Sequence, residues 1–176
     1  MIKKHLIFVL FILLSGAISA NIFVEHIVKN DFFEVRDDIA FAITGQGLVV
    51  AHRSDVATML NRISKDLAQQ AISMMRFAMP NPFKNPLNAS KTLYRHGVVI
   101  EFCSASLSAE TTAADPNNIL FCPFSIAVFQ LNSEPNQVHV SYLRLSQLAD
   151  KNNQKSINAL KAVEDVLGNI IQDALY

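Results

Sequence analysis

The chain has 176 residues, of which 51% are hydrophobic and 17% charged, and its 15 basic and 15 acidic side chains give no net charge. Disordered chains are poor in apolar residues and rich in charge, so this composition excludes extensive disorder. Nucleic-acid-binding domains usually carry a basic surface, and the balanced charge gives no sign of one. We therefore expect a folded protein that does not bind nucleic acid.

The first twenty residues have the three parts of a secretory signal peptide. Lys3 and Lys4 form a cationic start, residues 6–14 are an unbroken apolar run, and residues 15–20 are mostly small and end at Ala20. Nine apolar residues are too few for a membrane span, which needs about 20. We expect cleavage after Ala20, with an uncleaved anchor as the alternative. The predicted product, residues 21–176, is a single exported domain, periplasmic or secreted, with no membrane span.

The first part of this domain reads as strand, helix, strand and helix. Residues 21–29 and 48–52 are rich in β-branched residues and form the two predicted strands. Asp31 and Glu34 resemble a capping box, and apolar residues at helical spacing predict a helix over 32–44. The second predicted helix covers 55–72, and its apolar face consists of Val56, Leu60, Ile63, Leu67 and Ala71.

The second part reads as one strand, a short helix, a hairpin and a final helix. Residues 98–103 form the strand, and a weak helix over 105–115 ends at a proline. Strands 124–131 and 137–145 flank five turn-forming residues, which predicts an antiparallel hairpin. The last helix covers 156–175 and has an apolar face.

These elements predict an α+β fold, a two-layer sandwich in the order β-α-β-α-β-(α)-β-β-α. Its sheet should contain about five mostly antiparallel strands. We expect helices 32–44, 55–72 and 156–175 to pack on that sheet and bury their apolar faces against it.

Several of these features together resemble the family known as domain of unknown function 302. They are the helix after Asp31, the turn over 45–47 before a strand, the second helix after residues 54–56, and the segments 99–103 and 120–129. In that family a strand ends in a cysteine, and a second cysteine precedes a strand of the last hairpin. Here Pro123 follows the second cysteine, whereas the family usually places proline before it. The resemblance covers roughly residues 22–172 and implies a compact α/β sandwich, with no established reaction or cofactor.

Cys103 and Cys122 are the first candidate site. In an oxidising compartment they could form a disulfide, which requires Cα atoms within about 7 Å. Cytosolic members of the family that the chain resembles also contain both cysteines, which favours unpaired buried thiols or a redox or metal pair. Imidazole and thiolate suit copper or zinc, but the four histidines of the mature chain show no metal-binding spacing, so we expect no metal site or cofactor. These histidines are His26, His52, His96 and His139.

A second candidate site is the segment 76–90, which contains three prolines and shows no regular period. Long loops in compact domains are often functional, and methionine and aromatic side chains make an adaptable apolar surface. The candidate residues in and beside this segment are Met75, Phe77, Met79 and Phe83. We expect them to form either a lid over the core or a surface that binds a partner.

No motif for catalysis is present in the sequence, since it contains no phosphate-binding loop, nucleophile elbow or dinucleotide fingerprint. Glu101 and Cys103 should share a strand face, but a nearby carboxylate disfavours the thiolate that a nucleophile needs. We therefore expect a non-catalytic binding module for a small apolar ligand or a partner protein. The alternatives are a thiol-dependent redox or metal-handling protein and an assembly component that forms homo-oligomers.

Overall fold

The structure, a computed structural model, describes residues 21–78 and 93–176. Its frame is a five-stranded sheet in the order β1-β5-β4-β3-β2, in which all neighbouring strands are antiparallel. The predicted sheet and hairpin are thereby confirmed. The strands are β1 (Phe23–Val28), β2 (Val49–Asp55), β3 (Tyr94–Cys103), β4 (Phe124–Leu131) and β5 (Val138–Leu143).

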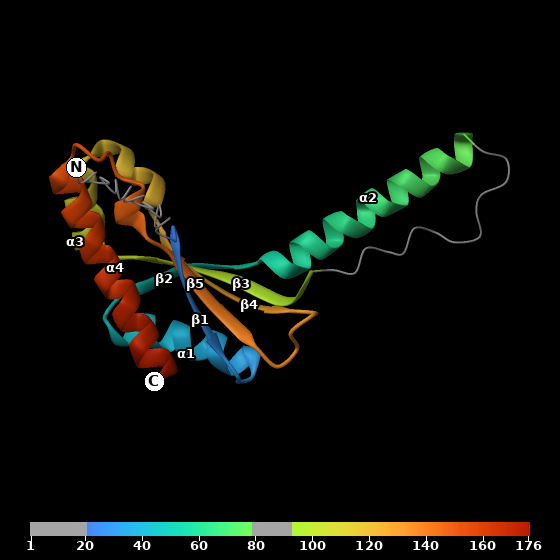
Figure 1. Cartoon of the computed structure of the whole chain (residues 1–176), viewed down its shortest axis with the longest axis horizontal. Coiled ribbons are helices and arrows are strands. Elements are labelled where there is room, and N and C mark those ends of the chain that lie inside the picture. The colour runs from blue at the N-terminus through green and yellow to red at the C-terminus, as the bar shows by residue number, and fades with distance from the viewer. Residues whose placement is uncertain (1–20, 79–92) are drawn as a thin grey trace, which may run out of the picture.

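The helices are α1 (Phe32–Gly45), α2 (Val56–Ala78), α3 (Ala105–Ala114) and α4 (Gln154–Leu175), with short 3-10 helices η1 (Pro116–Phe121) and η2 (Leu145–Gln147). Helices α1 and α4 lie together on one side of the sheet, and α3 contacts α4 (Figure 1). No helix among the described residues is long and apolar enough to cross a membrane.

The hydrophobic core lies between the sheet and the layer formed by α1 and α4. Alternate residues of the central strands, such as Ile100 in β3 and Ile126 in β4, are fully buried. From the helices, Ile39 and Leu167 complete the same apolar cluster. The two-layer α+β architecture predicted from the sequence is therefore confirmed.

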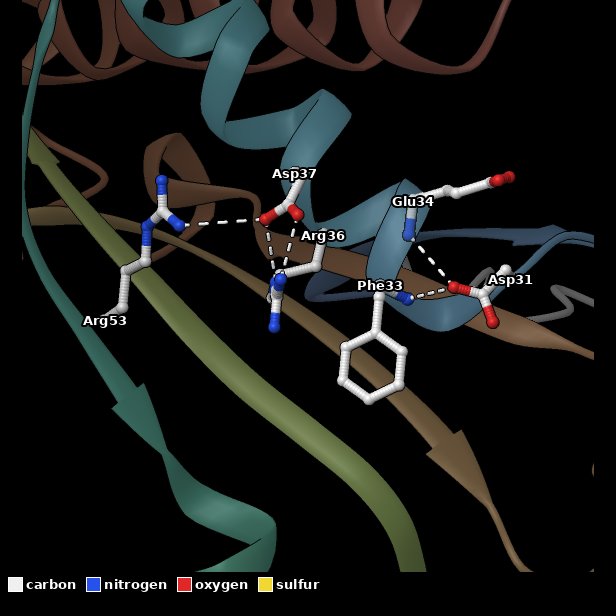
Figure 2. Close-up of polar contacts among 6 residues, drawn as sticks. All are labelled: Asp31, Phe33, Glu34, Arg36, Asp37 and Arg53. Carbon is white, nitrogen blue, oxygen red and sulfur yellow. Dashed lines mark hydrogen bonds and ion pairs between the residues drawn. The ribbon is translucent and has the colours of Figure 1, made fainter.

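Helix α1 begins where the sequence predicts, because Asp31 caps it. One carboxylate oxygen of Asp31 accepts hydrogen bonds from the backbone N–H groups of Phe33 at 2.8 Å and Glu34 at 3.2 Å (Figure 2). The expected return bond from Glu34 is replaced, since the N–H of Asp31 donates to the side chain of Asn30 at 2.8 Å. Asp31 therefore caps the helix without a reciprocal bond from Glu34. At its other end the helix stops at the turn over 45–47, in which only Gly47 has a positive φ, 74°.

Helix α2 departs most from the prediction. It follows β2 without a loop, reaches Ala78, and extends away from the rest of the chain (Figure 1). The expected packing of its apolar face on the sheet is wrong, since Leu60, Ile63 and Leu67 are exposed. Among the described residues, the contacts of α2 with the sheet lie at its base. Ala57 is buried against Gly97 in β3, where the two residues approach closely enough that a Cβ added to the glycine would lie 3.4 Å from that of Ala57.

Candidate functional site

An apolar stripe runs along the exposed length of α2. Its side chains are 38–72% exposed, an unusual state for leucine, isoleucine and methionine gathered on one helix face. The stripe consists of Met59, Leu60, Ile63, Leu67 and Met74. The charged side chains Arg62 and Lys65 lie on the other side of the helix, so α2 has one apolar face and one charged, solvated face.

The base of α2 is fixed to the domain by specific contacts. The carboxylate of Asp55 accepts from the backbone N–H and the hydroxyl of Thr58, both at 2.9 Å, and thereby caps the helix. The side-chain amide of Asn61 donates to the backbone oxygen of Tyr94 at 3.4 Å. The cap fixes the first turn of α2 to the end of β2, and the bond from Asn61 holds the helix against β3. The sheet therefore sets the direction of α2, and its apolar stripe is presented away from the core.

A pocket of about 240 Å³ lies beside this base, where the start of α1 faces β2 and β3. Its walls combine aromatic rings with three guanidinium groups and a histidine. The lining residues include Phe32, Phe33, Arg36, Arg53, Arg95 and His96. A shallower depression next to it shares Phe32, Phe33, Arg95 and His96, so the two are continuous.

Cys103 and Cys122 do not form a disulfide. Both are free: Cys103 is exposed at the end of β3, and Cys122 is partly buried after η1. The thiol of Cys122 lies 3.5 Å from the hydroxyl of Ser108, and it packs against the core. The structure therefore contradicts both the predicted disulfide and the burial of Cys103. The antiparallel pairing of β3 with β4 places Cys103 and Cys122 at the same end of these two strands, but the sulfurs are not bonded.

The four histidines do not gather around the cysteines. His26 lies near Tyr176 with ring centroids 6.4 Å apart, His52 is exposed on β2, and His96 stacks on Phe32 at 5.0 Å. Among residues 21–78 and 93–176, no three metal-ligating side chains form a cluster suited to a metal ion. Glu101 lies opposite His52 in the β2–β3 register, on the strand that ends at Cys103.

His139 is bound between two carboxylates on the sheet face opposite the core helices. Its Nδ1 lies 3.0 Å from Glu25 of β1, and its Nε2 lies 2.9 Å from Glu134 in the β4–β5 turn. Its ring stacks on Phe129 with centroids 4.8 Å apart and an angle of 8° between the planes. The side chain is only 7% exposed. This arrangement connects three segments of the chain, and every polar atom of the ring has a partner.

Two of the four predicted loop residues belong to a helix. Met75 and Phe77 fall within α2, because the helix continues six residues beyond its predicted end at 72. Met79 and Phe83 lie outside the described residues. Arg36, Arg53, Arg95 and Phe33 were not among the candidate site residues predicted from the sequence. Their spacing along the chain carries no local motif, since the sheet topology alone brings them together.

Comparisons with known proteins agree with this architecture. The sequence profile of a family described as "Domain of unknown function DUF302" matches residues 83–174, just over half of the chain. The crystal structure of an uncharacterized conserved protein DUF302 from Bacillus stearothermophilus is similar, with a TM-score of 0.60 and 15% identity over 88% of this chain and 99% of that chain. No curated protein matches. At this identity the likeness shows the fold alone.

Proposed function

The chain belongs to the DUF302 family, and we propose that within it this protein is a non-catalytic binding module that acts as a pair of chains joined through α2. The observation that carries the proposal is the apolar stripe on α2, whose side chains are 38–72% exposed in the single chain. Exposed apolar surface of this extent on a protruding helix is typical of an interaction site. The partner we propose is α2 of a second copy.

The spacing of the stripe favours a helix as its occupant. Leu60, Ile63 and Leu67 are separated by three and four residues, and Met74 follows one heptad later. This is the alternation with which one helix packs along another. A second α2 supplies the same stripe, so that one surface serves both chains across a two-fold axis. A small apolar ligand needs an enclosed cavity, whereas this surface is convex and open.

The energy of such a pairing is modest. Burying an exposed leucine or methionine side chain contributes about 1.5–3 kcal/mol, and these side chains are about half exposed, so each gains about 1 kcal/mol. Five from each chain then give about 10 kcal/mol, against an association cost of about 4–15 kcal/mol. Helix α2 is about 35 Å long, which limits the interface to the small end of the known range. We therefore expect a pair that dissociates on dilution.

Sedimentation of the purified protein between about 1 and 500 μM tests this. The wild-type chain should shift from one copy to two as its concentration rises, because dilution separates a weak pair. Ile63→Glu, which places a charge in the exposed stripe, should remain a single chain throughout. Lys65→Glu, on the solvated face, is the matched control and should behave as wild type. A wild-type chain that stays single, or an Ile63→Glu chain that still pairs, contradicts the proposal.

The thiol alternative receives no support from the geometry. Cys103 and Cys122 are both free, and their side chains occupy different environments, one exposed and one packed against the core. A redox couple between them would require the sulfurs to meet. We therefore propose no redox or metal chemistry for this protein.

We further propose that the protein acts after export from the cytoplasm. The support is the cationic start, apolar run and small residues of positions 1–20. When the full chain is expressed in a Gram-negative bacterium, the protein recovered from the periplasm should begin at Asn21, as its intact mass will show. Changing Leu10 and Leu13 to arginine should keep the full-length chain in the cytoplasm. Recovery of only the uncleaved chain from the wild-type gene would contradict the proposed cleavage.

A further inference from the structure

The pocket at the base of α2 has an aromatic wall that faces outward. Phe33 is 47% exposed, although a phenylalanine beside an available core would normally be buried. Its ring lies 5.3 Å from that of Phe32 and 5.1 Å from that of His96. His96 in turn stacks on Phe32 with an angle of 22° between the planes. The three rings form a wall against which a flat apolar group can pack.

The arginines around this wall differ in whether their charge is already balanced by a carboxylate of the protein. Two hydrogen bonds to Asp37, at 2.9 and 2.8 Å, neutralise Arg36, and its guanidinium carbon lies 5.2 Å from the centre of the Phe33 ring (Figure 2). These hydrogen bonds lower the pKa of Asp37 and raise that of Arg36. Arg36 therefore lines the pocket with its charge already balanced by Asp37, and it is not left to bind an external anion.

Two other guanidinium groups remain available. Arg53 makes one long contact, 3.8 Å to Asp37, and its side chain is 46% exposed. Arg95 makes no hydrogen bond or ion pair with any residue in the described part of the chain. The carboxylate of Asp55, the one acidic group among the lining residues, accepts hydrogen bonds from Thr58 and balances one of these two positive charges. The pocket thus carries excess positive charge beside an aromatic wall.

We propose that this pocket binds a small aromatic carboxylate, with the carboxylate held by Arg53 and Arg95 and the ring packed on Phe33 and His96. Guanidinium groups suit carboxylates because their N–H donors match the two oxygens. The pocket itself has a volume of about 240 Å³, below the roughly 300–1,000 Å³ usual for drug-sized ligands, and it opens into the shallower depression beside it. A single-ring acid is therefore the smallest ligand that makes both contacts. The inference goes beyond the pairing of chains through α2 and does not depend on it.

Titrations of the ¹⁵N-labelled protein, followed by the amide signals of His96 and Gly97, test the site with three probes. Benzoate carries both the ring and the charge, benzamide has the ring without the charge, and inorganic phosphate has the charge without the ring. Benzoate should bind at least tenfold more tightly than either of the others, because each lacks one of the two contacts. Equal binding of benzoate and benzamide, or of benzoate and phosphate, overturns the proposal, as does no response to 20 mM benzoate.

Variants locate the site independently. Arg53→Gln and Arg95→Gln should each weaken benzoate binding about tenfold, since each removes one charge-assisted contact from an exposed position that the fold does not need. Phe33→Leu should also weaken it, because an apolar side chain remains but the aromatic ring is lost. Arg62→Gln, on α2 outside the pocket, is the control for general surface charge. A loss in Arg62→Gln equal to that in Arg53→Gln overturns the assignment.

Discussion

Replacing Leu167 by alanine should lower the free energy of unfolding by about 2–5 kcal/mol, as expected for a leucine truncated in a packed core. Leu167 is 1% exposed and lies in the cluster where α4 meets the sheet. Its removal withdraws apolar contacts and leaves a cavity that the surrounding strands and helices fill only in part. Urea denaturation followed by far-ultraviolet circular dichroism measures the change as a shift of the midpoint at constant slope.

The same substitution at Leu67 is the matched control. Leu67 is 59% exposed on α2, so alanine there should change the free energy of unfolding by less than about 0.5 kcal/mol at a concentration where chains are single. The comparison tests the position of α2 directly. If Leu67→Ala costs as much as Leu167→Ala at high dilution, then α2 packs on the core of its own chain and its stripe is not free to bind a second copy.

Replacing Asn118 by alanine should cost about 1–3 kcal/mol, because it breaks a buried polar network. Asn118 is 3% exposed, and its side-chain amide donates at 2.8 Å to the backbone oxygen of Thr111 and at 2.8 Å to the hydroxyl of Ser156. These bonds connect η1 with α3 and α4. The backbone oxygen of Thr111 keeps a second donor, the N–H of Asp115, so the principal loss is the partner of the Ser156 hydroxyl.

The neighbouring residue provides the control for this network. Asn117 is exposed, and within the described part of the chain its side chain bonds to Asp115 alone, so Asn117→Ala should cost less than about 0.5 kcal/mol. In the double variant Asn118→Ala with Ser156→Ala, the hydroxyl left without its partner is also gone. Its cost should therefore be smaller than the sum of the two single costs. Strictly additive costs would mean that the two side chains do not stabilise each other.

Much of the fold follows from local signals in the sequence. Asp31 lies where the helix begins, the turn formers between β4 and β5 mark a hairpin, and the apolar spacing of α4 matches its buried face. The cap and the hairpin turn depend on contacts between residues close in the chain. The buried face of α4 follows from its regular apolar spacing, which any hydrophobic core would bury. Such features depend little on the rest of the structure, so the sequence is sufficient to predict them.

The predictions that were wrong concern features that depend on residues distant in the chain or on another chain. The spacing of Leu60, Ile63 and Leu67 correctly predicts an amphipathic helix, but periodicity does not say whether the apolar face meets its own sheet or another chain. For Cys103 and Cys122, strand assignment predicts proximity but not the sulfur separation a disulfide requires. The pocket lined by Phe33, Arg53 and Arg95 could not be predicted from the sequence, because these residues come from α1, β2 and β3. They come together only when the sheet has folded.

The contact between Glu25 and His139 has a consequence for the edge of the sheet. β1 is an edge strand, paired only with β5, and it begins three residues after the predicted cleavage point. A shift of one residue in its pairing would turn Glu25 toward the core helices and bury a carboxylate among apolar side chains. The bond to His139 is available in one alignment alone. This hydrogen bond therefore favours a single alignment of a six-residue edge strand, and it guards against the slips in register to which edge strands are prone.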